Sequence, residues 1–94
     1  MRLYEIVYII NPTLDEENVQ KVVDKVAEQV TKTGGEVVNI ENWGNKKLSY
    51  EIKGFFEGIY ILMKFNAGAR ASGELQRNLE LSDEVIKHMA IRLN

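Results

Sequence analysis

The sequence predicts a single domain of the α+β class, in which four strands form one antiparallel sheet and two helices cover one of its faces. Two segments repeat their apolar residues with the helical period, and strand-like apolar runs precede, separate and follow them in the order βαββαβ. The 94 residues also suit one domain, because either half alone is too small to bury a useful core.

The opening segments predict a strand and then a helix. Residues 3–10 are rich in Ile, Val and Tyr, and Asn11-Pro12 ends this run. Residues 13–16, Thr-Leu-Asp-Glu, fit a capping box, so we expect the Thr13 hydroxyl to cap the helix. Gly34-Gly35 supplies the positive φ that ends it. The apolar stripe that should face the core consists of Val19, Val22, Val23, Val26 and Val30.

The rest of the chain predicts two strands, a second helix and a last strand. Residues 36–52 are mixed but strand-like, and Gly44-Asn45 interrupts them where a bulge fits. Residues 53–58 should form a hairpin loop, and the apolar run 58–65 a central third strand. A helix over 67–81 and a strand over 85–93 follow. Right-handed crossovers then place the first and third strands in the middle of the sheet.

The sheet face without helices should be unusually apolar. An open antiparallel face normally carries polar side chains, and apolar surface left in water forgoes about 25 cal/mol per Å² of burial. We therefore expect this face, or the edge beside it, to contact a partner, unless loops or the chain's own ends cover it. The two sets of side chains are Tyr4, Ile6, Tyr8 and Ile10 against Leu3, Val7 and Ile9 in the first strand, and Ile59, Ile61, Met63 and Phe65 against Tyr60 and Leu62 in the third.

The charge is slightly negative and unevenly distributed. The net charge of −2 argues against nucleic-acid binding by bulk electrostatics alone. Acidic residues predominate over residues 14–42, whereas basic residues predominate over residues 43–70. The asymmetry predicts one acidic and one basic side, and the alternative is an ordinary solvated helix face with lysines on a strand edge.

No catalytic residue, metal site or cofactor is predicted. The chain has no cysteine, and the single His88 cannot form a histidine-based metal site unless carboxylates supply the other ligands. Residues 68–73 have the glycine spacing of a phosphate loop, but Glu74-Leu75 stands where Lys-Ser/Thr is required. No run approaches the roughly 18 apolar residues that span a bilayer, and the N-terminus lacks the pattern of a signal peptide. We expect a cytoplasmic protein.

Residues 44–53 carry the most specific pattern in the chain, Gly-Asn-Lys-Lys-Leu-Ser-Tyr-Glu-Ile-Lys. This segment resembles the signature of the bacterial small-subunit ribosomal protein S-six family, in which a glycine precedes basic residues, Leu, a small residue, Tyr, a variable position, Ile and Lys. The opening Met1-Arg2-x-Tyr4-Glu5, the Trp43-Gly44 pair and residues 83–89 are also similar to that family. The matching segments cover nearly the whole chain in the right order.

The resemblance implies a ferredoxin-like βαββαβ sandwich with a structural role and no catalysis. Members of the family bind the central domain of the small-subunit (16S) ribosomal RNA as a heterodimer with ribosomal protein S-eighteen, in the platform of the subunit. A basic partner would supply much of the phosphate neutralisation that this chain lacks. On this interpretation the chain alone is a monomer. The alternative is a homodimeric ferredoxin-like regulatory or ligand-binding module that pairs through the apolar sheet face.

The resemblance also implies which residues contact RNA. Arg2 would be a phosphate-binding cation and Tyr4 a stacking or hydrogen-bonding ring, both on the first strand. The fourth strand, which neighbours the first, would complete one RNA-facing edge. Its residue 87 is Lys where the family often has Arg, which keeps the charge but loses bidentate geometry. The full RNA-binding set is Arg2, Tyr4, Lys53, Lys87, His88 and Arg92. From the residues alone, His88 is expected to be a partly buried strand histidine.

The second strand lies at the opposite edge, in the region that the family presents to its protein partner. The residues expected there are Glu41, Trp43, Lys46, Lys47 and Leu48. Charged side chains on an exposed edge also block unwanted strand pairing, so Glu41 and Lys46 have this second interpretation.

Overall fold

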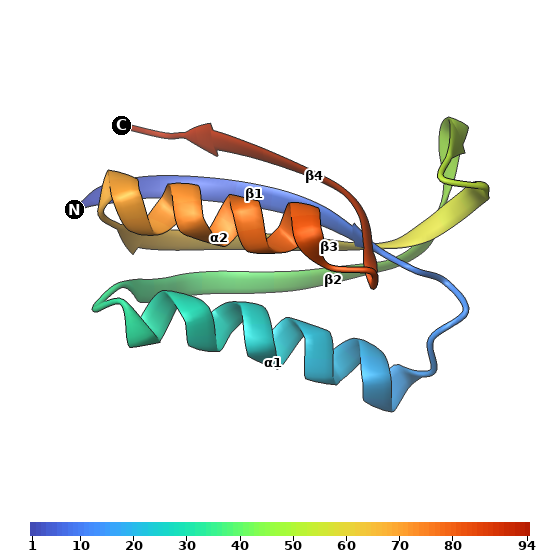
Figure 1. Ribbon diagram of the computed structural model, residues 1–94, viewed down its shortest axis with the longest axis horizontal. Helices are drawn as coiled ribbons and strands as arrows, with labels where there is room; N and C mark the ends of the chain where they lie inside the picture. Colours follow the sequence, from blue (N-terminus) through green and yellow to red (C-terminus); the bar gives the residue numbers. More distant parts are fainter.

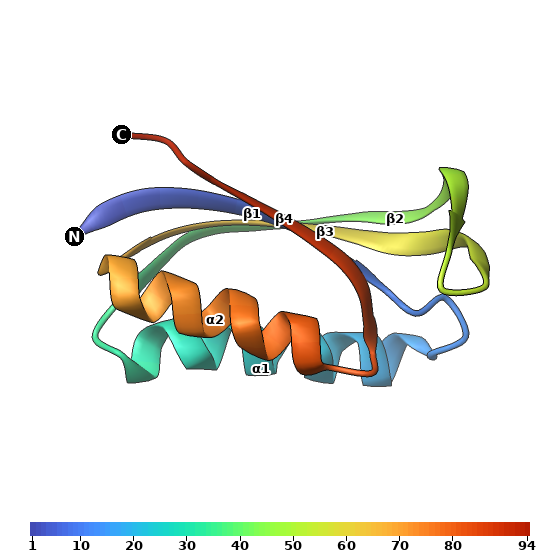
Figure 2. The ribbon, with the colours of Figure 1, turned by 45° about the horizontal axis from the view of Figure 1, so that its top comes forward.

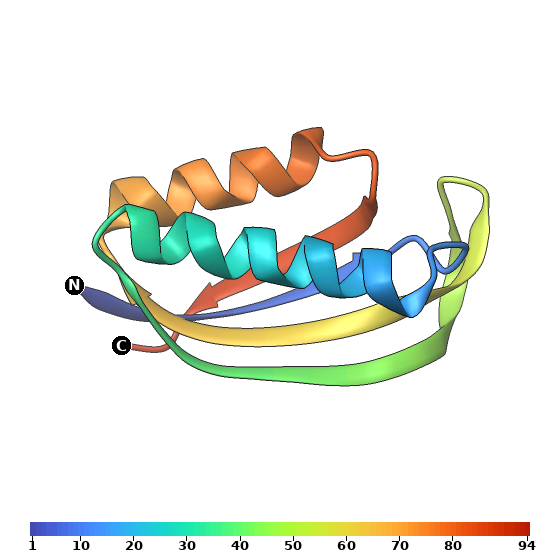
Figure 3. The ribbon, with the colours of Figure 1, turned by 90° about the horizontal axis from the view of Figure 1, so that it is seen from below.

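The computed structural model describes residues 1–94 and has the predicted order of elements and sheet topology (Figure 1). All strand pairs are antiparallel and the strand order is β2-β3-β1-β4, so the prediction that the first and third strands are central is confirmed. Both helices lie on one side of the sheet (Figures 2 and 3). The elements are β1 (Arg2–Ile10), α1 (Glu16–Lys32), β2 (Glu36–Ile52), β3 (Phe55–Ala67), α2 (Ala69–Leu81) and β4 (Val85–Arg92).

The core lies between the helices and one face of β1 and β3. The predicted valine stripe of α1 is buried along its whole length. Cross-strand partners share a face of a sheet, so the pairs Ile6–Met63 and Tyr8–Ile61 put the even residues of β1 and the odd residues of β3 on the helix side. The buried sheet residues on this side include Tyr4, Ile6, Tyr8, Ile10, Ile61, Met63 and Phe65.

The helix α1 begins later than predicted, because Asn11 satisfies Thr13. The Thr13 backbone N–H and the Thr13 hydroxyl both donate to Asn11 Oδ1, at 2.9 and 2.7 Å. Such an Asx turn removes Thr13 as a cap. Asp15 is the N-cap instead, and its Oδ1 accepts from the Asn18 backbone N–H at 2.9 Å. The predicted Thr13 cap is therefore wrong, whereas the positive φ after the helix is confirmed at Gly34 (+83°).

The β2–β3 hairpin is tighter than predicted. Its turn consists of Lys53 and Gly54 alone, which both have positive φ (51° and 85°), and Ile52 pairs with Phe55. The predicted loop over residues 53–58 is therefore too long, because Gly58 belongs to the sheet and is buried. The predicted interruption at Gly44 is confirmed as a shift of register between Asn42 and Gly44, with Gly44 at φ +78°.

On the sheet face opposite the helices, apolar side chains are exposed at the end near the chain termini and buried at the end near the hairpin. Met89 and Ile91 of β4 pair with Val7 and Glu5, point to this face and are 51% and 57% exposed. Near the hairpin, by contrast, Ile9 is only 2% exposed. The expectation of an open apolar face thus holds for the end that carries Met89 and Ile91. Neither helix is both long and apolar enough to cross a membrane.

Gly58 is required by close packing at the end of this face near the hairpin. A Cβ there would overlap Ile9 Cγ2 and lie 3.2 Å from Ile86 Cδ1. We expect Gly58→Ala to lower the free energy of unfolding by about 1–3 kcal/mol, because the neighbours must move. Gly73→Ala is the control: this site in α2 is open, and the substitution should raise stability by about 0.5–1 kcal/mol. Urea unfolding measures both, and a Gly58→Ala protein as stable as the unmodified chain would contradict the packing argument.

Tyr8 is fully buried, and its Oη has no hydrogen-bond partner. An unsatisfied buried hydroxyl costs about 1–3 kcal/mol, so Tyr8→Phe should raise the free energy of unfolding at neutral pH. Burial, with a smaller contribution from the charge of Asp24, raises the pKa of the Tyr8 phenol far above its ordinary value. The folded state therefore keeps this proton above about pH 10, where an unfolded tyrosine loses it.

The same burial predicts a loss of stability in alkali. Because the unfolded chain binds fewer protons than the folded chain above about pH 10, the free energy of unfolding falls there by up to about 1.4 kcal/mol per pH unit for this group. Tyr8→Phe lacks the group, so its stability advantage should grow as the pH rises past 10. Urea titrations of both proteins at pH 7 and in the alkaline range measure this difference, and a constant difference would show that Tyr8 is not the group responsible.

Candidate RNA and protein interfaces

The bulge in β2 brings together three of the residues expected to meet a protein partner. Glu41 pairs with Leu62 and Lys46 with Gly58, both even positions of β3, so both point to the face without helices. The Trp43 Nε1–H donates to Glu41 Oε1 at 3.1 Å, and Lys46 Nζ lies 6.0 Å from the centre of the Trp43 ring. We call these three residues the Trp43 cluster. Trp43 is 44% exposed.

The bulge also explains why the other two residues of that set lie elsewhere. Strict alternation would separate residue 46 from residues 41 and 43, and the extra residue at the bulge restores it to their face. Lys47 pairs with Glu57 and therefore points to the opposite face. Leu48 is half-buried beyond the regular pairing, near the hairpin turn. The predicted partner set is thus split between two faces.

Arg2 and Arg92 form the best-defined cationic site among the expected RNA-binding residues. Arg92 pairs with Tyr4, two residues from Arg2, so the two arginines are diagonal neighbours on one face, with Cβ atoms about 7 Å apart. Both are exposed. They lie at the end of the sheet where the two chain termini meet (Figure 1). We call them the arginine pair.

Tyr4 is a core residue. It is 8% exposed, and its ring stacks on that of Phe65 with centroids 5.5 Å apart and planes at 22°. The alternation that places Arg2 on the helix side places Tyr4 there too, but beneath the layer of packed side chains. The ring is therefore packed within the core, and the RNA contact of Tyr4, as a stacking or hydrogen-bonding ring, stays a prediction.

His88 also points inward. It pairs with Tyr8, which puts it on the helix side, and its side chain is only 17% exposed. Its Nδ1 lies 3.8 Å from Glu80 Oε2 of α2. The interpretation as a partly buried strand histidine is correct, and the RNA contact of His88 stays a prediction.

Lys87 and Lys53 belong to the other end of the molecule. Lys87 pairs with Ile9 and points to the face without helices, where its Nζ donates to Tyr50 Oη at 2.8 Å. Lys53 occupies the hairpin turn and is exposed. The hairpin lies opposite the chain termini (Figure 1), so these lysines and the arginine pair are at opposite ends. Tyr50 was not among the expected site residues, although it lies within the segment that carries the resemblance.

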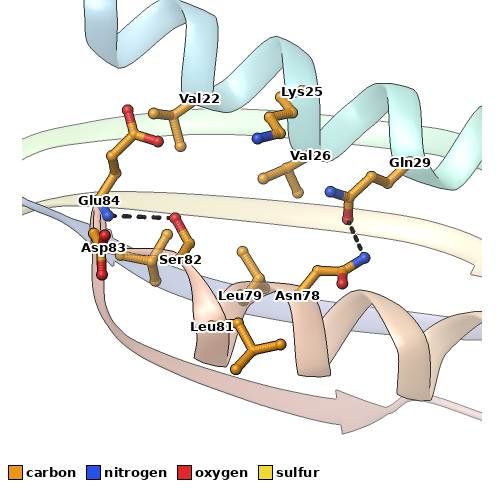
Figure 4. Close-up of a pocket in the computed structure, with 11 residues that line it drawn as sticks. Val22, Lys25, Val26, Gln29, Asn78, Leu79, Leu81, Ser82, Asp83 and Glu84 are labelled. Carbon is orange, nitrogen blue, oxygen red and sulfur yellow. Dashed lines mark hydrogen bonds between the residues drawn. The ribbon is translucent and has the colours of Figure 1, made fainter.

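A groove of about 530 Å³ runs between α1 and α2 (Figure 4). Val22, Val26 and Leu79 line it, and Asn78 Nδ2 bridges the helices by donating to Gln29 Oε1 at 3.4 Å. Lys25, Asp83 and Glu84 contribute its charged groups. Nowhere in the chain do three or more His, Asp or Glu side chains come close enough to hold a metal ion.

The fold defines a protein of the ferredoxin-like class, which carries the Trp43 cluster on β2 and cationic side chains along β4. The comparisons with known proteins specify the family. The family model described as ribosomal protein S6 matches residues 3–92. The chain is 44% identical over 92 residues to the small ribosomal subunit protein bS6 of Desulfitobacterium hafniense, covering 98% of this chain and 97% of that protein. It is 46% identical over 91 residues to bS6 of Clostridium botulinum, covering 97% of each.

A solved structure agrees with these matches. The crystal structure of 30S ribosomal protein S6 from Thermotoga maritima superposes with a TM-score of 0.91 at 30% identity, covering 97% of this chain and 86% of that one. The chain belongs to the ribosomal protein S6 family. It is therefore a structural protein of the small ribosomal subunit, in the cytoplasm, and not an enzyme.

Proposed function

We propose that the chain binds the central domain of the small-subunit ribosomal RNA together with ribosomal protein S-eighteen during assembly of the platform. The observation that carries this proposal is that two candidate interfaces of the chain lie at opposite edges of the sheet. The Trp43 cluster lies on β2 and the arginine pair includes Arg92 of β4, which are the two outer strands. A protein bound at one edge therefore leaves the other edge free for RNA.

The charge of the chain supports the need for a partner. Its net charge is −2, whereas phosphate binding by a single protein rests on clustered Lys and Arg. The arginine pair supplies two positive charges at one place, which is enough to position a phosphate but not to neutralise many. A basic partner adds the remaining contacts.

The Trp43 cluster has the composition of an anchor for a protein partner. Tryptophan is among the residues that contribute most to protein–protein binding. The contacts with Glu41 and Lys46 restrict the Trp43 side chain before binding, which lowers the entropy that association must remove. Glu41 also presents a negative charge to a basic partner.

The second candidate function is a homodimeric regulatory or ligand-binding module. The exposure of Met89 and Ile91 on the free sheet face favours it, because apolar side chains there could pack against a second copy. Sedimentation separates the two proposals: a monomer at micromolar concentration supports the ribosomal function, and a tight dimer supports the module.

The proposed function predicts that RNA binding depends on the partner. Affinity for a central-domain fragment of the ribosomal RNA should be weak for the chain alone and at least tenfold tighter with S-eighteen, because the complex joins two sets of phosphate contacts. Filter binding at fixed salt measures both affinities. Equal affinity with and without S-eighteen would overturn the proposal.

The arginine pair predicts a change in salt dependence. Arg2→Ala should reduce the slope of log affinity against log salt by about 0.7 to 1 in the complex with S-eighteen, because one phosphate contact is lost. Arg77→Ala, an exposed arginine of α2, is the matched control and should leave the slope unchanged. If Arg2→Ala has the same slope as the control, Arg2 does not bind a phosphate.

A further inference from the structure

The hairpin arm, residues 47–57, carries the two most exposed aromatic rings among the tyrosines and phenylalanines. Tyr50 is 62% exposed and Phe56 is 68% exposed, whereas the remaining Tyr and Phe side chains are buried or half-buried. Exposed rings of this size have apolar faces that remain hydrated in the free protein. The arm extends beyond the body of the molecule (Figure 1), and the exposed fractions show that both rings are accessible to a partner.

The Tyr50 ring is held in place by Lys87. The Lys87 Nζ donates to Tyr50 Oη at 2.8 Å and lies 5.2 Å from the ring centre. Because Nζ is so much closer to the hydroxyl than to the centre, it sits beyond the hydroxyl rim and not above the face of the ring. Lys87 thus fixes the ring orientation and leaves the ring faces unoccupied. A ring oriented before binding loses less side-chain entropy when a ligand stacks on it.

The surroundings of these rings suit a nucleotide better than an apolar protein surface. Lys53 lies in the turn between the two rings and Lys87 contacts Tyr50, whereas Lys47 of the arm points to the opposite face; the chain as a whole has a net charge of −2. Separate aromatic rings interspersed with lysines are the arrangement that binds single-stranded nucleic acid, in which bases stack on rings and cations follow the backbone.

The direction of β4 connects the arm to the arginine pair. β4 starts at Val85, contacts the arm through Lys87 and Tyr50, and ends at Arg92 beside Arg2. Eight residues of strand extend about 26 Å, which several nucleotides can span. The arginine pair lies on the helix side of β4 and Tyr50 on the side without helices, so one RNA segment that reaches both must cross the β4 edge.

We propose that Tyr50 and Phe56 form a base-stacking platform for unpaired nucleotides, with Lys87 as the residue that positions Tyr50. This inference rests on the proposed RNA binding and changes the role of Lys87 from a phosphate contact to a support for an aromatic ring. It also predicts that the RNA at this end of the protein is a bulge, loop or single strand and not a continuous duplex.

The test measures binding of the full chain with S-eighteen to the central-domain RNA fragment, at several salt concentrations. Tyr50→Leu and Phe56→Leu should each weaken binding at least fivefold, since one stacked base contributes roughly 5- to 150-fold in affinity. Their salt slopes should equal that of the unmodified chain, because no charge is lost. Leu81→Ala is the matched control: it removes an exposed apolar side chain of α2 outside both proposed interfaces and should leave S-eighteen capture and RNA affinity unchanged.

The role of Lys87 is tested by a double-mutant cycle. Lys87→Met should weaken binding without changing the salt slope, and it should have little further effect in a Tyr50→Leu background. A slope reduced by about 0.7 to 1, with an undiminished effect in that background, would assign Lys87 to a phosphate and overturn the positioning role.

The remaining outcomes separate the two proposals. If the unmodified complex binds the RNA and both leucine variants bind equally well, the platform is overturned and the proposed function stands. If the leucine variants lose S-eighteen and not RNA, the rings belong to the protein interface. If the unmodified complex does not bind the RNA fragment, the proposed function fails and the platform fails with it.

Discussion

The packing of the α1 valine stripe against the even residues of β1 determines where every other side chain of the sheet points. Once Ile6 and Tyr8 are buried under the helices, strand pairing assigns a face to each residue of β3 and β4. His88 is turned inward by its pairing with Tyr8, and Lys87 is turned outward by its pairing with Ile9. The surfaces available for binding are thus a consequence of a core contact that they do not touch.

Bulges modify this assignment at the positions of the proposed interfaces. The extra residue near Trp43 returns Lys46 to the face of Glu41, and a register shift between Ile9 and Ile10 accommodates Ile86 before Lys87. Each bulge changes which neighbours in the chain become neighbours in space. A short stretch of sequence can therefore place a cation, an acid and an indole side by side on one outer strand.

The sequence predicts the periodic features of this fold well and the local ones poorly. The valine spacing, the four strands and their order are confirmed, because each depends on many residues whose burial points the same way. The Thr13 cap and the six-residue hairpin loop were wrong, because a single Asn11 side chain and the packing of Gly58 decide them. The burial of Tyr4 did not follow from the sequence, since an aromatic side chain suits a core as well as a surface, whereas the partial burial of His88 was predicted from the residues alone. The accessible rings of Tyr50 and Phe56 were missed because exposure depends on how far the hairpin arm extends beyond the body of the molecule.

The hydrogen bonds that join the two ends of the chain also hold the arginine pair together. β4 closes against β1 through bonds near both ends of the chain, where the Leu93 N–H donates to the Leu3 carbonyl at 2.8 Å and the Leu3 N–H donates to Asn94 Oδ1 at 2.8 Å. Arg2 and Arg92 are neighbours only while this closure lasts. An anion that bridges both arginines binds the closed sheet and not the frayed one, so by mass action it stabilises the docked strand. Anion binding at the arginine pair and the docking of β4 on β1 therefore stabilise each other.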